Sequence, residues 1–165
     1  MYKRQWIDYA NQDGTGAAHY FNRIGYPWLS QKWVRAVQSA AFGGTDPYSG
    51  YNGDEDQGQM GSLSALMAIG LFQFDGGSAI DPRYDITAPV FDKVTIQLSS
   101  KYYSGKEFTI TTKNQSPENV YIQSATWNGQ PLNTCWLSHE DLVKGGVLEL
   151  DLGPEPNKQW GTGNK

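Results

Sequence analysis

The sequence predicts an α+β fold, with helices in its first half and a small antiparallel β module in its second. Two observations lead to this division. Apolar residues recur at helical spacing up to about residue 75, whereas from about residue 93 they alternate with polar residues. Between these regions lie Gly76, Gly77, Pro82 and Pro89, which are typical of a connection. We therefore expect a helical segment over residues 1–75, a connector over 76–92, a β module over 93–161 and a tail over 162–165.

Three helices are expected in the first half. The first follows capping residues 13–15 and ends at Gly25, because glycine commonly follows a helix. The second begins at Pro27, and its apolar stripe should face the core: Leu29, Trp33, Val37, Ala40 and Ala41. The third runs from residue 56 or 57 to about 72 and is apolar on nearly every side. Two short helices cannot enclose such a helix, so we expect further helical structure beyond this chain.

The second half contains five expected strands. They cover residues 94–98, 107–113, 120–127, 132–137 and 147–152. Asn128-Gly129 is a strong signal for a hairpin after the third strand. Residues 139–142 are expected to form a turn or one helical turn, with His139 in a turn role, and His19 is expected to be a packed or surface histidine rather than a ligand.

Composition excludes several classes of function. The 165 residues carry a net charge of -4, which argues against a nucleic-acid or polybasic membrane partner. No apolar run is long enough to cross a bilayer, and residues 2–8 contain no hydrophobic signal core. The single cysteine, Cys135, rules out an internal disulfide framework. The six Trp, ten Tyr and six Phe suit either a core or sugar stacking.

An acidic run, Asp54-Glu55-Asp56, precedes the third helix. If this loop is extended, Asp54 and Asp56 point to the same side and could converge on one water or one metal. At a helix N-terminus the ionised form of Asp56 would be stabilised, which suits a general base. A helix cap with solvated neighbours explains the same residues and is favoured on this stretch alone. An EF-hand is excluded, since the required Gly and Glu positions are not matched.

Longer motifs resemble one known family. The run from Gly50 to Met60, continued by the small-residue helix to Phe72, resembles the signature of family 92 glycoside hydrolases. The resemblance extends over the whole chain, through Gly25–Trp28, Tyr121–Ala125, Asn128–Gly129, His139, Gly145–Gly146, Leu152–Asn157 and Trp160–Gly161.

The resemblance implies a calcium-dependent, inverting, exo-acting α-mannosidase, mostly bacterial and often specific for α-1,2 linkages. Enzymes of this family are several times longer, with an N-terminal β-sandwich followed by an (α/α)6 barrel. The chain resembles their C-terminal portion, namely the last barrel helices and a terminal β module. The implied partners are an α-mannoside of N-glycan or mannan type and the missing N-terminal portion. The implied location is periplasmic or extracellular, although this chain shows no signal peptide.

The resemblance also implies site residues. Asp54 and Asp56 match the catalytic base pair of the family, while its general acid lies upstream, so this chain alone is expected to be inactive. Tyr48 and Tyr51 beside the acidic run are expected to contact sugar. Asn11-Gln12 resembles the Asn-Glu loop of the family, with Gln12 where Glu is common, and both are expected substrate contacts. No calcium ligand can be assigned.

A carbohydrate-binding or structural β module without catalysis is the alternative. Its candidate aromatic contacts are Tyr102, Tyr103, Trp127 and Trp136. This alternative does not explain the acidic run before the third helix.

Overall fold

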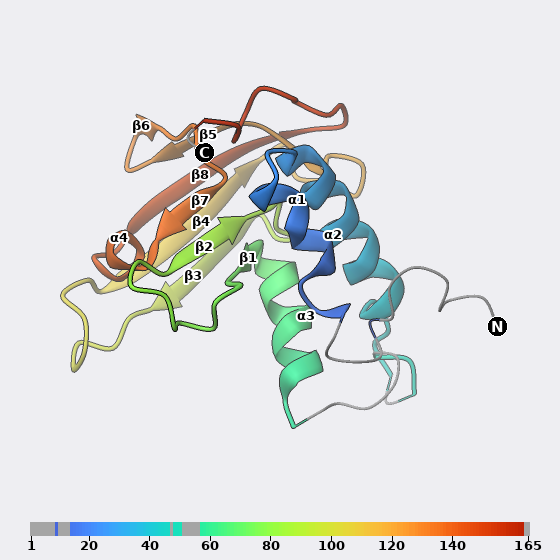
Figure 1. The fold of residues 1–165 in the computed structure, drawn as a ribbon, viewed down its shortest axis with the longest axis horizontal. Helices are drawn as coiled ribbons and strands as arrows, with labels where there is room; N and C mark the ends of the chain where they lie inside the picture. Colours follow the sequence, from blue (N-terminus) through green and yellow to red (C-terminus); the bar gives the residue numbers. More distant parts are fainter. Residues whose placement is uncertain (1–8, 10–13, 47, 51–56, 164–165) are drawn as a thin grey trace.

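A computed structural model of the protein describes residues 9, 14–46, 48–50 and 57–163 (Figure 1). The longer helices α2 and α3 lie at one side and the strands at the other (Figure 1). This arrangement confirms the α+β prediction, with helices first and sheets after them.

The helical part is shorter than its sequence pattern predicted. A 3₁₀ turn over Ala17–His19 leads into α1 (Tyr20–Arg23), which is followed by α2 (Pro27–Ala41) and α3 (Gln59–Ile69). The expected continuation of α3 to residue 72 is wrong, because residues 71 and 72 form strand β1 (Leu71–Phe72). Gly70 ends the helix in a left-handed conformation, at φ +79°. A Cβ on Gly70 would meet the Thr87 carbonyl oxygen at 2.4 Å, so only glycine lets the two segments approach here.

The strands form two sheets. The smaller is antiparallel in the order β1-β2-β7, and its β2 (Arg83–Ile86) lies within the segment taken as a connector. The larger has the order β3-β4-β8-β5-β6. The bounds are Lys93–Gln97 for β3, Glu107–Lys113 for β4, Tyr121–Trp127 for β5, Gln130–Pro131 for β6, Trp136–Ser138 for β7 and Gly146–Gly153 for β8. Helix α4 (His139–Val143) lies between β7 and β8, as the expected helical turn.

The larger sheet is mixed, which corrects the prediction of a purely antiparallel module. Strands β4 and β8 are parallel, from the pair Phe108 and Gly146 to the pair Lys113 and Asp151. Parallel strands need a crossover connection. Here the connection from β4 to β8 runs through β5, β6, β7 and α4. Strand β8 then lies between β4 and β5 in the sheet.

The hairpin between β5 and β6 is confirmed. Asn128 and Gly129 both have positive φ, at 50° and 77°, as a tight two-residue turn requires. Their neighbours Trp127 and Gln130 are paired across it. The expected strand over 132–137 is shorter, because β7 begins at Trp136 and pairs with β2 in the other sheet.

Two hydrophobic clusters form the interior. The larger one lies between the sheets and includes Phe108, Ile110, Ile122, Leu148 and Leu150. The smaller one lies among the helices and includes Tyr9, Val34, Phe42, Met60, Leu63, Met67 and Phe72. Helix α3 contacts both, since its Leu66 and Ile69 pack against the larger cluster. This double contact explains why α3 has apolar residues on nearly every side.

The expected apolar stripe of α2 is confirmed in part, since Val37 and Ala41 pack against the smaller cluster. The buried residues of the helix include Ser30, Gln31 and Val34, whereas Trp33 of the stripe is 44% exposed and Ala40 is exposed. The side-chain oxygen of Gln31 accepts a hydrogen bond from the backbone N–H of Ile122 at 2.9 Å. Helix α2 therefore turns polar side chains toward the β module, because backbone groups there need partners.

Arg35 makes the most extensive of these contacts. Its guanidinium donates to the carbonyl oxygens of Pro89 at 2.7 Å, Ala88 at 3.3 Å and Ser116 at 3.5 Å. Burial lowers the pKa of Arg35. One side chain thus joins α2 to two separate segments of the β module.

Replacing Arg35 tests how much this contact stabilises the fold. Arg35→Ala leaves three carbonyl groups without their donor, so we expect the free energy of unfolding in urea to fall by about 1–3 kcal/mol. Lys32→Ala, on the exposed side of the same helix, is the matched control and should change it by less than about 0.5 kcal/mol. Equal effects of the two substitutions would contradict a specific role for Arg35.

Candidate functional site

Most residues implicated by the sequence lie outside the described part of the structure. These are Asp54, Asp56, Tyr51, Asn11 and Gln12. Tyr48 is the one described member of the set, so the structure does not report whether it lies beside the others. The described residues that flank segments 10–13 and 51–56 form the surroundings of the candidate site.

Tyr48 lies in a tight turn between α2 and α3. The Asp46 carboxylate accepts hydrogen bonds from the backbone N–H of Tyr48, at 2.8 Å, and from the Ser49 hydroxyl. These hydrogen bonds hold the pKa of the Asp46 carboxyl below its ordinary value, and the one from the Ser49 hydroxyl contributes most. The Tyr48 side chain is 96% exposed, so it is available to a ligand.

The residue that caps α3 is Gly58, and not the expected Asp56. The helix begins at Gln59, and Gly58 precedes it in a left-handed conformation at φ +98°. The carbonyl of Gly58 accepts the first helical hydrogen bond, from the N–H of Ser62 at 3.0 Å. Gln57 also has a positive φ, of 58°. The N-cap position thus lies two residues after Asp56, which itself is outside the described residues.

Residues flanking both segments are fixed to the same core. Tyr9 accepts a hydrogen bond at its hydroxyl from the N–H of Ala18 at 2.9 Å and contacts Phe42 edge-on. Its burial raises the pKa of Tyr9. Met60, the second residue of α3, is fully buried in the same cluster as Tyr9. Tyr9, just before segment 10–13, and Met60, shortly after segment 51–56, are therefore both anchored in the same helical core.

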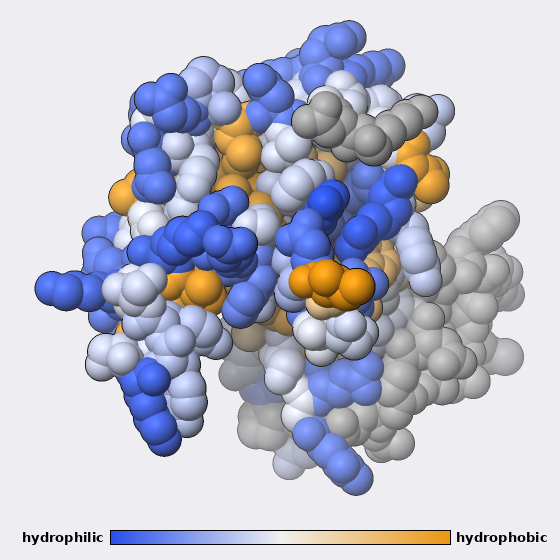
Figure 2. All heavy atoms as spheres, turned by 60° about the vertical axis from the view of Figure 1, so that its left-hand side comes forward, coloured by the Kyte–Doolittle hydropathy of each residue, from blue (hydrophilic) through white to orange (hydrophobic). Residues whose placement is uncertain are grey.

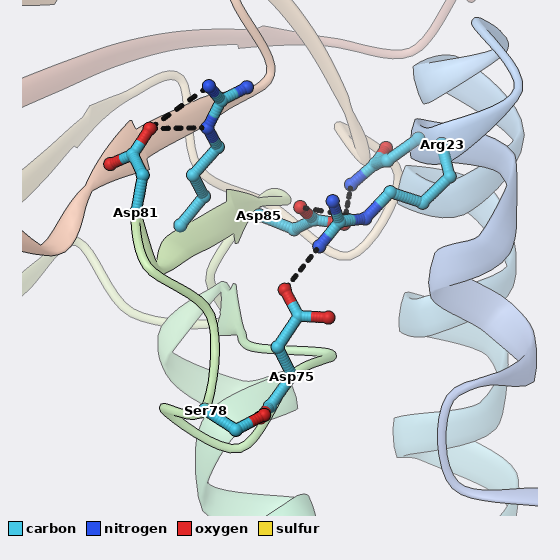
Figure 3. Close-up of polar contacts among 7 residues, drawn as sticks. Arg23, Asp75, Ser78, Asp81 and Asp85 are labelled. Carbon is cyan, nitrogen blue, oxygen red and sulfur yellow. Dashed lines mark hydrogen bonds and ion pairs between the residues drawn. The ribbon is translucent and has the colours of Figure 1, made fainter.

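A buried polar cluster that the sequence analysis did not foresee joins α1 to β2 (Figure 3). The Asp85 carboxylate is nearly fully buried and accepts a hydrogen bond from the side-chain amide of Asn22 at 3.1 Å. Arg23 lies between two carboxylates, 3.9 Å from Asp85 and 3.8 Å from Asp75 (Figure 3). Burial raises the pKa of Asp85 to about 6, although Asn22 and Arg23 oppose the shift. Asn22 and Asp85 are 63 residues apart, so no local pattern links them.

His19 is packed, as expected, and not exposed as a ligand. It is fully buried and stacks on Phe72 with ring centroids 4.0 Å apart, while Phe74 contacts it edge-on. Neither ring nitrogen has a hydrogen-bond partner among the described residues. Because burial disfavours the charged imidazolium, the pKa of His19 falls to about 3.

The described residues were also tested as a metal site. Within residues 9, 14–46, 48–50 and 57–163, no group of three or more His, Cys, Asp or Glu side chains could hold a metal ion. Calcium prefers six to eight oxygen ligands, which include carboxylates, backbone carbonyls and waters.

The two buried titratable groups predict opposite effects of pH on stability. The unfolded chain binds a proton at His19 near pH 6.5 and the folded chain only near pH 3, so stability is lost as the pH falls below about 6.5. Asp85 has the reverse sign. Its folded pKa, about 6, lies above the ordinary 3.8, so it adds stability as the pH falls through this interval.

Two substitutions separate these contributions. We expect His19→Phe, which keeps a stacked ring, to reduce the loss of stability between pH 7 and pH 4.5. Asp85→Asn, which still accepts a hydrogen bond from Asn22, should make that loss steeper. Urea denaturation at several pH values measures both slopes. Identical slopes in wild type and His19→Phe would contradict the neutral, buried state of His19.

Comparison with known proteins gives a consistent family. The glycosyl hydrolase family 92 catalytic domain matches residues 1–154. An uncharacterized secreted glycosidase of Arthroderma benhamiae is 36% identical over 155 residues, which are 93% of this chain and 19% of that protein. The chain therefore spans about a fifth of the length of the curated relative that it matches.

Solved structures share the fold. A family GH92 α-mannosidase from Bacteroides thetaiotaomicron superposes with a TM-score of 0.81 at 25% identity, over 92% of this chain and 19% of that one. A GH92 inverting mannosidase from the VPI-5482 strain of the same organism gives a TM-score of 0.78 at 33% identity, over 93% of this chain and 20% of that one. The family match covers far more than half of the sequence, and the chain therefore belongs to glycosyl hydrolase family 92.

Proposed function

We propose that this chain is the C-terminal portion of a calcium-dependent, inverting exo-α-mannosidase that hydrolyses terminal α-linked mannose, with α-1,2 linkages as the preferred substrate. The match of residues 1–154 to the family 92 catalytic domain carries this proposal. The names of the structural neighbours support it, since one is an α-mannosidase and another an inverting mannosidase. The role of this chain is to supply the catalytic base loop.

The proposed base is Asp56, with Asp54 beside it in the sequence. In an inverting glycosidase, a carboxylate deprotonates a water that attacks the anomeric carbon, while a carboxylic acid protonates the leaving oxygen. The two carboxyl groups lie roughly 6.5–9.5 Å apart to leave room for that water. Asp54 would orient the same water.

Sugar contacts are proposed for Tyr48, Tyr51, Asn11 and Gln12. The exposure of the Tyr48 ring supports its part, since a buried ring could not contact a sugar. The Bacteroides thetaiotaomicron α-mannosidase has also been solved in complex with mannoimidazole. The proposed substrate is an α-mannoside of N-glycan or mannan type.

A periplasmic or extracellular location is proposed for the whole protein. The Arthroderma benhamiae relative is described as a secreted glycosidase, which supports this location. In the described part of the chain, none of the helices has the length and apolar character needed to span a bilayer.

Asp56→Asn tests the base assignment in the full-length enzyme. We expect kcat for α-1,2-mannobiose to fall by about 10²–10⁴-fold, because the attacking water loses its base. The affinity for mannoimidazole should stay nearly unchanged. Asp81→Asn is the matched control, since Asp81 is an exposed acid of the segment before β2 and pairs with Arg83. Retained turnover in Asp56→Asn would remove Asp56 from the mechanism.

Removal of calcium tests the proposed cofactor. Dialysis of the full-length enzyme against a calcium chelator should abolish mannoside hydrolysis, and added calcium should restore it. Magnesium should restore little activity, because it demands a smaller, octahedral set of ligands. Full activity after exhaustive chelation would exclude a calcium requirement and leave the roles of Asp54 and Asp56 untouched.

The alternative function, carbohydrate binding by the β module, receives support from one observation. Tyr102 and Tyr103 are exposed aromatic residues on that module, at 69% and 37%. The other two candidates are less available. Trp127 packs against Phe108, and Arg83 covers the ring of Trp136 at 3.9 Å.

A further inference from the structure

Four aromatic side chains from three separate segments meet at one surface of the β module. We call them the aromatic platform: Tyr84 of β2, Tyr102 and Tyr103 of the β3–β4 connection, and His139 at the start of α4. The His139 ring lies 5.9 Å from Tyr84 and 6.0 Å from Tyr103, and Tyr102 lies 6.4 Å from Tyr103. The rings form a continuous series of contacts, although residues 84 and 139 are far apart in the chain.

The platform is held in place by the backbone. Tyr102 and Tyr103 both donate their N–H groups to the carbonyl of Ser99 at 3.0 Å, which closes the connection into a turn. The N–H of Gly105 then bonds to Val143 at the end of α4. A Cβ on Gly105 would meet the carbonyl carbon of Lys144 at 2.4 Å, so the connection lies directly against the segment that follows α4. The backbone that carries Tyr102 and Tyr103 is therefore held in place without a ligand.

Tyr102 has no evident role in the interior of the fold. Its side chain is 69% exposed, and the contacts found for its ring are Tyr103 and the ammonium of Lys101, 5.0 Å from the ring centre. Tyr103 is 37% exposed, whereas Tyr84 is half-buried against the sheet core. The outer end of the platform is thus open and the inner end is anchored.

The chemistry of this surface suits a sugar. Tyrosine presents an apolar ring face together with a hydroxyl that donates and accepts hydrogen bonds. A pyranose likewise has an apolar face of C–H groups bordered by hydroxyls. The imidazole of His139 and the ammonium of Lys101 add hydrogen-bonding groups at the border.

Other classes of ligand fit less well. The net charge of -4 disfavours nucleic acid. A protein partner usually requires a continuous apolar patch. Figure 2 turns forward the side of the molecule that carries α4 and the β3–β4 connection, and it shows mainly hydrophilic residues with small, separate apolar patches.

We propose that the aromatic platform is a non-catalytic binding surface for the pyranose rings of a mannoside chain. It lies on the side of the sheets away from α2, near α4 (Figure 1). The identity of the sugar as mannose rests on the proposed function, whereas the position of the surface rests on the platform itself. Such a surface would hold a mannan or glycan chain close to the enzyme while the catalytic site acts on its end.

Titration of the isotopically labelled 165-residue chain with α-1,2-mannobiose, followed by NMR, tests the proposal. We expect saturable shifts of the amide signals of residues 99–105 and 138–140. Tyr102→Ala and Tyr103→Ala should weaken this binding by about tenfold or more, since each removes a stacking surface. Phe91→Ala is the matched control, because Phe91 is 48% exposed just before β3 but belongs to none of these contacts. Circular dichroism melting checks that each variant remains folded.

The outcomes separate this proposal from the catalytic one. Shifts that are absent at tens of millimolar sugar, or that survive in Tyr102→Ala and Tyr103→Ala, would overturn the platform as a binding site. Binding of galactobiose in place of mannobiose would overturn mannose as its ligand. In the full-length enzyme, Tyr102→Ala should lower retention on yeast mannan while hydrolysis of mannobiose continues. Loss of hydrolysis in Asp56→Asn with unchanged retention on yeast mannan would support the catalytic proposal and would show that binding at the platform does not depend on it.

Discussion

Two side chains of α2 determine how the helical and β parts of this protein are joined: Arg35 donates to the carbonyl oxygens of Ala88 and Pro89, and Gln31 accepts from the N–H of Ile122. Backbone groups near Ala88 and Ile122 would otherwise be buried without partners, and polar side chains satisfy them at fixed distances. Directional bonds of this kind set the orientation of a helix more strictly than apolar contact does. Trp33 and Ala40 of α2 are exposed, whereas Val37 and Ala41 pack against the smaller cluster.

The same junction determines what can surround the candidate site. Helix α3 packs against both hydrophobic clusters, and Tyr9 and Met60 share one of them. The chain around the acidic segment is therefore tied to the helical core on one side and, through α3, to the sheets on the other. Asp85 and His19 add buried groups of opposite pH response close to this junction. The interior here is polar for a structural reason, because it joins elements that are distant in sequence.

The sequence was sufficient where the signal was local. The Asn128-Gly129 hairpin, the start of α2 at Pro27 and the bounds of β4 all follow from neighbouring residues. It failed where burial depends on distant partners, as for Gln31, or on a close approach, as for Gly70 against Thr87. The family match confirms the glycosidase reading of the Gly50–Met60 run, whereas the roles of Asp54 and Asp56 remain predictions. Asn22, Arg23 and Asp85 were missed because their partners lie 50 or more residues away.

The position of β8 has a consequence for how the chain reaches this fold. Strand β8, which follows the other described strands in the chain, occupies the centre of the larger sheet, between β4 and β5. During synthesis, the edges of β4 and β5 that pair with β8 therefore stay unpaired until residue 153 has left the ribosome. Pairing at such sequence separation is slow, and open strand edges invite aggregation in the interval. A chain cut short before residue 146 would lose the partner of both strands at once, so the sheet forms late or not at all.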